Sequence, residues 1–214
     1  MKRRVISAAL ALCMMLTLLS GTALAAGQHP FTDVPQSHWA NEAVGYVYEN
    51  DLMNGVSATM FQPGGSLTRA MFVTILGRMA GAEEESGESG FADVPAGSWY
   101  APYVNWAAAN GIVNGTSATT FDPSGQITRE QLAAILYRYT AKYAPDATGN
   151  AASLAAYPDA GSVSAYARDA MAWAVGNGLI KGLPHDKTDY LEPGGSTTRA
   201  QVATILMRYK QATA

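Results

Sequence analysis

An apolar face with helical spacing occurs three times along the chain. Within each occurrence the apolar positions fall at i, i+3, i+4 and i+7, which places them on one side of an α-helix. The three sets are Phe72, Ile75, Leu76 and Met79; Leu132, Ile135, Leu136 and Tyr139; and Val202, Ile205, Leu206 and Tyr209. The pattern predicts three amphipathic helices, each with one face in a core.

A second, weaker apolar stripe precedes the first two of these helices. It consists of Trp39, Ala43, Val44 and Val47 in one unit and of Trp99, Tyr103, Trp106 and Ala107 in the next. A glycine follows in each unit, at Gly55, Gly115 and Gly182, and glycine is typical of a helix stop or a turn. No unit shows a convincing alternation of strand residues. We therefore expect helix–loop–helix units and an all-α fold.

The motifs around these helices indicate that the units are copies of one another. Phe31-Thr-Asp33-Val-Pro35 recurs 60 positions later as Phe91-Ala-Asp93-Val-Pro95, and Thr68-Arg69 recurs as Thr128-Arg129 at the same shift. A third, drifted copy runs from Tyr157-Pro-Asp159 to Thr198-Arg199, with a shift that grows from 66 to 70. A register kept over so many positions is the signature of an internal repeat.

The shifts divide the chain into three units and two connectors. The units are expected at 31–81, 91–142 and 157–211, and the connectors, expected to be solvated, at 82–90 (acidic) and 143–156. A unit of two helices cannot bury its apolar faces alone. We therefore expect the three copies to pack on one another in a pseudo-threefold assembly.

The N-terminal segment has the pattern of a secretory signal peptide. Three basic residues at 2–4 precede an apolar run of 15 residues at 5–19, which is short of the roughly 20 needed to cross a bilayer. Ala23 and Ala25 form the small-x-small pattern of a signal-peptidase site. We expect residues 1–25 to be removed, leaving an exported chain without a membrane segment.

Composition narrows the function classes further. With 14 basic and 17 acidic residues the net charge is −3, and loss of residues 1–25 changes it to −6. Such an acidic chain is a poor candidate for nucleic-acid binding. The one cysteine, Cys13, lies in the signal segment, so a disulfide framework and a Cys-based zinc site are excluded.

The start of each second helix is the most informative position. Thr68, Thr128 and Thr198 are placed as N-caps; Gln131 and Gln201 complete a Thr-x-x-Gln capping box, and Met71 does not. The residues after the caps are Arg69, Arg129 and Arg199. A cation there opposes the helix dipole by roughly a few tenths of a kcal/mol, whereas helix N–H groups and a guanidinium together bind a carboxylate or phosphate well. Anion recognition and a structural pair with Asp33, Asp93 or Asp159 both remain open.

The aromatic residues before the first helices also allow two interpretations. Trp39 and Trp99 either pack into the core or form a half-exposed platform for a sugar ring beside the arginine. The third copy has only Tyr166 nearby, and its loop carries Pro184-His185-Asp186-Lys187. We expect this copy to be altered or silent.

Catalysis and metal binding find little support. The three histidines do not repeat together, and no His-x-x-x-His, Gly-x-Ser-x-Gly or phosphate-loop pattern is present. A calcium site through the three aspartates is weak, because no Asp-x-Asp-x-Asp loop accompanies them. We expect no enzyme activity, no cofactor and no metal site.

The repeated motifs resemble the S-layer homology (SLH) domain, present as a triplet over about 31–211. The matching motifs are Phe-x-Asp-Val-Pro with the tryptophan, Asn-Gly, Phe-x-Pro-x-Gly and Thr-Arg-Ala/Glu. The resemblance implies a pseudo-threefold, three-pronged helical assembly with a central helical bundle. It also implies binding of secondary cell-wall polymers, often pyruvylated polysaccharides, in grooves between repeats on the bacterial surface.

The resemblance assigns residues as well. The arginine that binds the acidic sugar corresponds to Arg69, Arg129 and Arg199, and the aromatic residue of the groove corresponds to Trp39 and Trp99, with Tyr166 in the third copy. The acidic residue of the motif corresponds to Asp33, Asp93 and Asp159. The loop glycine corresponds to Gly55, Gly115 and Gly182. The usual motif glutamate is replaced by Met71, Gln131 and Gln201, so a different affinity or sugar preference is expected.

The main hypothesis is a secreted, non-enzymatic carbohydrate-binding module of the cell surface and S-layer. The alternative is a structural adaptor for other surface proteins, with drifted sugar grooves, and a wall-remodelling enzyme comes third. Because the chain ends at Ala214, three residues after the third copy, we expect it to act alone at the wall or through a protein partner.

Overall fold

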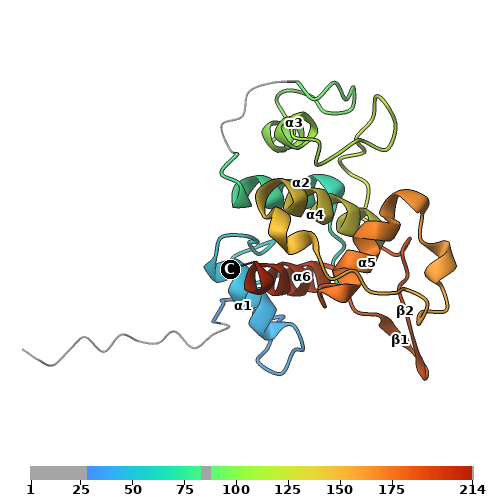
Figure 1. The fold of residues 1–214 in the computed structure, drawn as a ribbon. Helices are drawn as coiled ribbons and strands as arrows, with labels where there is room; N and C mark the ends of the chain where they lie inside the picture. The colour runs from blue at the N-terminus through green and yellow to red at the C-terminus, as the bar shows by residue number, and fades with distance from the viewer. Residues whose placement is uncertain (1–27, 83–87, 214) are drawn as a thin grey trace, which may run out of the picture.

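The structure is a computed structural model that describes residues 28–82 and 88–213. The predicted signal peptide and residues 83–87 of the predicted acidic linker lie outside this part of the chain. Within it, each repeat contributes one helix of nine residues and one longer helix. The helices are α1 (Asn41–Glu49) and α2 (Arg69–Met79), α3 (Ala101–Ala109) and α4 (Arg129–Tyr143), and α5 (Arg168–Gly176) and α6 (Arg199–Ala212). The described chain is therefore mostly helical, as the periodicity predicts (Figure 1).

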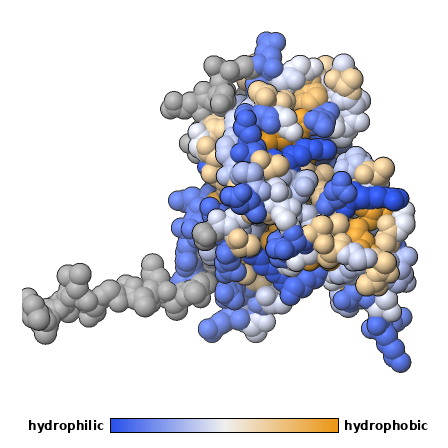
Figure 2. All heavy atoms as spheres, in the orientation of Figure 1, coloured by the Kyte–Doolittle hydropathy of each residue, from blue (hydrophilic) through white to orange (hydrophobic). Residues whose placement is uncertain are grey.

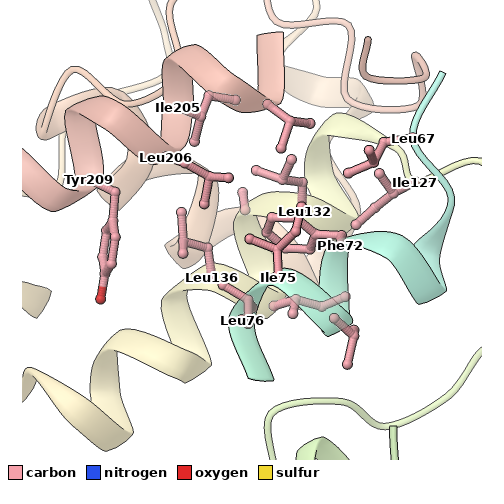
Figure 3. Packing of buried hydrophobic residues seen from close by; sticks show 14 of the residues in the cluster. Leu67, Phe72, Ile75, Leu76, Ile127, Leu132, Leu136, Ile205, Leu206 and Tyr209 are labelled. Carbon is pink, nitrogen blue, oxygen red and sulfur yellow. The ribbon is translucent and has the colours of Figure 1, made fainter. Parts of the chain in front are cut away.

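The apolar faces of α2, α4 and α6 meet in the core. Phe72, Leu132 and Val202, which hold equivalent positions in the three repeats, are fully buried. Figure 3 shows side chains of all three helices pointing toward one another, with Leu67 and Ile127 at one end. The three faces predicted from the sequence thus form one shared core rather than three separate ones.

The first helix of each repeat packs against the second helix of a different repeat. In the described structure, α3 contacts α2, α5 contacts α4 and α1 contacts α6. The α2–α3 contact depends on Gly77, since a Cβ atom there would lie 2.4 Å from Cδ1 of Tyr103. A repeat therefore completes its helix pair with a neighbour.

A closed cycle of backbone hydrogen bonds joins the segments just before α2, α4 and α6. The N–H of Leu67 donates to the carbonyl of Thr197 (3.1 Å), Thr197 N–H donates to Ile127 (3.0 Å), and Ile127 N–H donates back to Leu67 (3.0 Å). All three residues are buried, so these bonds satisfy backbone groups that water does not reach. The N-termini of the three long helices therefore converge.

The third repeat departs from the all-α prediction. Strands β1 (Leu183–His185) and β2 (Thr188–Tyr190) form an antiparallel hairpin in its loop. This is the segment in which the sequence carries extra residues, and they extend the loop far enough for its two sides to pair. The tip of the hairpin is hydrophilic (Figure 2).

The second linker is bound more firmly than a solvated connector. It is mostly exposed, but it contains the short 3-10 helix η1 (Pro145–Thr148) and its backbone bonds to α5. Ala152 N–H donates to Ala172, and the indole of Trp173 donates to the carbonyl of Ala147 (2.8 Å). Two further 3-10 turns, η2 (Ala160–Ser162) and η3 (Ala165–Ala167), lead into α5.

Among the described residues, no helix combines the length and apolar character that a membrane crossing requires.

Candidate functional site

The arginines at the helix starts connect neighbouring repeats. Each one is buried, with 3–9% of its surface exposed, and its Nε donates to a backbone carbonyl of another repeat. The three bonds are Arg69 to Phe121 (2.8 Å), Arg129 to Leu191 (2.6 Å) and Arg199 to Phe61 (2.7 Å). In two of the three the guanidinium also lies over an aromatic ring, that of Phe121 at 4.7 Å and that of Phe61 at 4.5 Å. All three arginines therefore have a structural role at the joints.

The Arg69 joint has fewer hydrogen bonds than the other two. Arg129 donates a second bond from Nη2 to Lys181 (2.8 Å) and Arg199 donates one to Asn54 (2.6 Å). Arg69 makes no such second bond within the described residues. The facing loop differs in backbone conformation, because Gly115 has φ of 74° while the equivalent Gly55 has no positive φ. Arg69 thus keeps more of its guanidinium N–H groups for another partner.

The aspartates bind the loops that accept these arginine bonds. Asp93 accepts from the N–H groups of Phe121 (2.8 Å) and Asp122 (2.7 Å). Asp33 does the same for residues 61 and 62, and Asp159 for 191 and 192. Within the described chain none of the three arginines forms a direct ion pair. The alternative of a direct arginine–aspartate pair, which the sequence left open, is therefore not found among the described residues, and the two groups meet through a shared peptide segment.

The environment shifts the pKa values of both kinds of group. Burial is the largest influence on Arg69, Arg129 and Arg199 and lowers their pKa, while nearby carboxylates act in the opposite direction. For Asp33 and Asp93, partial desolvation acts to raise the pKa, but the backbone N–H donors outweigh it and the net pKa is lowered. The carboxylates are therefore held in their charged form.

Two grooves lie at the joints. The first, here called the Arg69 groove, has a volume of about 360 Å³ and takes residues from all three repeats. Its walls are Arg69, the loop 113–116, the α4 residues Gln131, Ala134, Ile135 and Arg138, and Tyr166. Cationic, amide and aromatic groups thus surround one cavity.

The second groove, here called the Arg129 groove, repeats this plan one unit further along. Its volume is about 410 Å³, and its walls are Arg129, the loop 179–184, the α6 residues Gln201, Thr204, Ile205 and Arg208, and Trp39. Its loop wall is more apolar, with leucine, isoleucine and proline side chains in place of the asparagine and threonine of the first groove.

The three predicted groove aromatics are exposed and not in the core, and two of them line a groove. Trp39 is 66% exposed, Trp99 58% and Tyr166 54%, so the core interpretation is wrong for both tryptophans. Trp39 lines the Arg129 groove and Tyr166 lines the Arg69 groove. Trp99 lines neither and lies edge-on against Tyr100, with ring centroids 5.3 Å apart. The third repeat, expected to be altered or silent, thus supplies one wall of a groove.

A carboxylate that the sequence reasoning missed fixes the position of Tyr166. Glu130 accepts hydrogen bonds from the Ser164 N–H (2.9 Å), the Ser164 hydroxyl (2.8 Å) and the Tyr166 hydroxyl (3.1 Å). Burial, together with the charge of Glu130, raises the pKa of Tyr166 to about 12. The equivalent residues Ala70 and Ala200 cannot make this clamp, so no repeat signal revealed it.

Arg138 and Arg208 were also missed, although a signal for them exists. Together with Arg78 they lie nine residues after the three helix-start arginines, so they recur with the same shifts of 60 and 70. Arg138 and Arg208 line the two grooves, whereas Arg78 is exposed and lines neither. Their recurrence at the repeat shifts, later in the helix than the first turn, is the signal that marks them in the sequence.

The remaining predicted residues support the loops and helix starts. Thr68 Oγ1 accepts from the Met71 N–H (3.2 Å), and the other two caps are complete capping boxes formed by Thr128 with Gln131 and by Thr198 with Gln201. Gly55, Gly115 and Gly182 lie against the aromatic ring that begins each repeat; a Cβ atom at Gly55 would lie 2.3 Å from Cε1 of Phe31. Among the described residues no group of His, Cys, Asp and Glu is arranged to hold a metal ion.

Sequence comparison connects this geometry with a known family. Three segments, 30–71, 90–133 and 156–203, match the S-layer homology domain. The chain belongs to the SLH domain family. Each matched segment holds one helix-start arginine of the SLH chain, whereas Arg138 and Arg208 lie beyond the matched segments.

The relatives of this SLH chain are larger proteins, among them an enzyme and two surface-layer proteins. It is 34% identical over 178 residues to an endoglucanase of Bacillus sp. (strain KSM-635), covering 83% of the chain and 18% of the relative. It is 32% identical over 172 residues (80% and 14%) to a surface-layer 125 kDa protein of Lysinibacillus sphaericus, and 28% identical over 207 residues (96% and 24%) to an S-layer protein of Bacillus thuringiensis subsp. finitimus. The chain thus spans less than a quarter of the length of these relatives. Family and relatives together indicate a secreted protein of the bacterial cell surface.

Proposed function

We propose that this SLH chain is a non-enzymatic module that attaches to the cell wall by binding an anionic secondary cell-wall polymer in the grooves between its repeats. The observation that carries the proposal is the composition of the Arg69 groove, in which the guanidinium groups of Arg69 and Arg138 and the exposed ring of Tyr166 surround one cavity. Guanidinium groups suit an acidic substituent, and an aromatic face suits a sugar ring. A pyruvyl carboxylate is the anion that we favour.

We also propose that the three repeats form a pseudo-threefold, three-pronged assembly around a central bundle of α2, α4 and α6. Two observations support this arrangement. The backbone hydrogen bonds before the three helices form a closed cycle, and the helix pairs α2–α3, α4–α5 and α6–α1 follow the same cyclic order. On this arrangement, equivalent grooves recur around the axis, and their residues come from all three repeats.

The predicted site residues divide into two roles within this proposal. Arg69, Arg129, Trp39 and Tyr166 form the surfaces of the two grooves, and Arg199 and Trp99 are assigned the same role at the remaining joint. The aspartates and glycines act on the loops instead, because their contacts are to backbone and to ring atoms of their own repeat. The N-cap threonines hold the helix starts.

The test is co-sedimentation of the chain lacking residues 1–25 with purified cell-wall sacculi. This truncation leaves every described residue in place. The expected result is binding to intact sacculi that is lost after hydrofluoric acid removes the wall polymer. Equal binding before and after stripping contradicts polymer recognition. Absence of binding to both favours the adaptor alternative, in which the chain binds another surface protein.

A further inference from the structure

The arginines that line the grooves differ in how many contacts their guanidinium groups make within the protein. Arg69 is 4% exposed, donates from Nε to the Phe121 carbonyl and stacks on the Phe121 ring. A side chain so placed is needed to close the joint between the first two repeats, whatever else it contacts. Its removal therefore affects the fold and the groove together.

Arg138 lines the same groove but makes none of these contacts within the described residues. It is half-buried on α4, and within the described residues it donates no hydrogen bond and forms no ion pair. The equivalent Arg208 of the Arg129 groove donates from Nη1 to the carbonyl of Leu179 (3.3 Å). Arg78, the third equivalent, is exposed and lines neither groove. Of these three arginines, Arg138 alone combines a place in a groove with a guanidinium that has no described acceptor.

The surroundings of Arg138 leave its charge available. Three acidic side chains of the described chain lie near this groove. The carboxylate of Glu130 already accepts three hydrogen bonds from Ser164 and Tyr166, that of Asp93 accepts two from backbone N–H groups, and the charges of Asp93 and Asp122 act on Arg69. Arg138 and Tyr166 both line the groove, and the positive charge of Arg138 acts to lower the pKa of the Tyr166 hydroxyl. Gln131, about two turns earlier on α4, adds an amide to the same surface. An anion that enters the groove meets the two guanidinium groups of Arg69 and Arg138.

We propose that Arg138 is the residue that contacts the anionic group of the polymer in the Arg69 groove, and that Arg69 acts mainly by positioning this groove. The inference rests on the proposed function and goes beyond it by naming the groove and the side chain that recognise the anionic group. The fork of Arg138 is matched to a carboxylate or phosphate oxygen pair. The Arg129 groove, where Arg129 and Arg208 already donate to backbone carbonyls, then selects the anion less strongly.

The equivalent arginines provide matched variants for the test. Arg138→Ala, Arg138→Lys, Arg208→Ala and Arg78→Ala are compared with the unchanged chain by sedimentation with intact sacculi over a range of protein concentrations. Arg138→Ala is expected to weaken binding by about tenfold or more, because a charge-assisted contact is lost. Arg78→Ala is expected to change binding less than about twofold, as is usual for an exposed charge. Arg138→Lys keeps the charge without the fork and is expected to fall between the two.

Soluble probes distinguish the sources of the anion. A methyl hexoside with a 4,6-linked pyruvate ketal, its methyl ester and a hexose 6-phosphate are titrated as competitors of sacculus binding. Competition by the free ketal but not by its ester identifies a carboxylate, and competition by the phosphate alone identifies a phosphate. In either outcome the competitor must lose its effect in Arg138→Ala.

The outcomes separate this inference from the proposed function. If the unchanged chain needs the polymer and Arg138→Ala binds as tightly as it does, the inference is overturned while the proposed function stands. If the unchanged chain does not bind sacculi, both are overturned. Because Arg138 makes no described hydrogen bond, its alanine variant is expected to keep the unfolding midpoint of the unchanged chain, and a matching thermal unfolding curve excludes misfolding as the cause of lost binding.

Discussion

Arg69 and Asp93 bind the same residue from opposite sides. The Nε of Arg69 donates to the carbonyl of Phe121 at 2.8 Å, and the carboxylate of Asp93 accepts the N–H of Phe121 at 2.8 Å. Arg69 comes from the first repeat, whereas Asp93 and Phe121 belong to the second. The arrangement recurs at the other two joints, so the feature that looks like a ligand motif in the sequence also joins the repeats.

This double role predicts that Arg69→Ala lowers stability as well as binding. The substitution removes a buried, charge-assisted hydrogen bond and leaves the Phe121 carbonyl without its donor. The expected loss is roughly 2–3 kcal/mol in the free energy of unfolding, measured by urea denaturation followed by circular dichroism. Arg78→Ala, an exposed arginine one helix length away, is the control and is expected to change stability by less than about 0.5 kcal/mol. Unchanged stability with abolished wall binding contradicts the structural role.

The local features of the fold were predictable, because they depend on neighbouring residues. The helices α2, α4 and α6 begin at Arg69, Arg129 and Arg199, directly after the predicted caps, since capping and helical periodicity act over one or two turns. The repeat shifts located the third copy despite its drift. The extra residues marked the loop of the third repeat as different, but their short, polar sequence has no strand alternation from which the hairpin could have been predicted.

Features that depend on other repeats were not predictable in the same way. The exposure of Trp39 follows from its place beside the third repeat, where it lines the Arg129 groove, and no local pattern encodes that contact. The bond from Arg69 to Phe121 crosses 52 positions. Glu130 occurs in one repeat alone, so self-comparison is silent about it. Arg138 and Arg208, in contrast, recur at the repeat shifts and could have been found.

Stability is expected to fall at acidic pH because of the aspartates. The backbone N–H donors outweigh desolvation and hold the folded-state pKa of Asp33 and Asp93 below the ordinary value of about 3.9. Their contribution is therefore complete above that value and is lost as the pH falls through the lowered pKa. Urea denaturation between pH 7 and pH 2 measures this loss. The Asp33→Asn/Asp93→Asn variant is expected to be less stable at pH 7 and to show a flatter decline below pH 4. An equally steep decline in this variant assigns the acid sensitivity to other groups.

The packing of α3 on α2 predicts a penalty for Gly77→Ala. The added methyl group would lie 2.4 Å from Cδ1 and 3.2 Å from Cγ of Tyr103, atoms near the root of a ring that cannot easily move away. Overpacking costs about 1–3 kcal/mol, and the better helix propensity of alanine offsets about 1 kcal/mol of this. A net loss of about 1 kcal/mol is expected in chemical denaturation. In a Tyr103→Ala background the same substitution should become neutral or stabilising; a penalty that persists there is inconsistent with this contact.

The fluorescence of Trp39 is expected to report on ligand binding in the Arg129 groove, because this residue lines the groove. Of the four tryptophans, Trp39 and Trp99 are more than half exposed, whereas Trp106 and Trp173 are buried. Acrylamide is therefore expected to quench only part of the intrinsic fluorescence, and a Trp39→Phe/Trp99→Phe variant should lose most of the quenchable part. Trp99→Phe alone leaves Trp39 as the exposed reporter. Solubilised wall polymer is expected to protect it from quenching, and unchanged quenching at saturating polymer places the ligand outside the Arg129 groove.

The clamp of Glu130 on Tyr166 predicts that a residue outside the groove lining controls binding in the Arg69 groove. In Glu130→Ala the segment from Ser164 to Tyr166 loses three hydrogen bonds, so the ring is free to leave the groove edge. Sacculus binding is expected to weaken several-fold. The pKa of Tyr166, raised to about 12 by burial and by the charge and hydrogen bond of Glu130, should fall because the contribution of the carboxylate is gone. NMR titration of ring-labelled tyrosine measures the pKa.

Three variants separate positioning by Glu130 from contact by the ring itself. Tyr166→Phe keeps the ring and loses only the hydroxyl bond, so it should bind better than Tyr166→Ala. Glu42→Ala removes an exposed carboxylate of α1 and should leave both binding and the Tyr166 pKa unchanged. If Glu130→Ala binds sacculi like the unchanged chain while Tyr166→Ala does not, the ring holds its place without Glu130, and packing against the groove loop must position it instead.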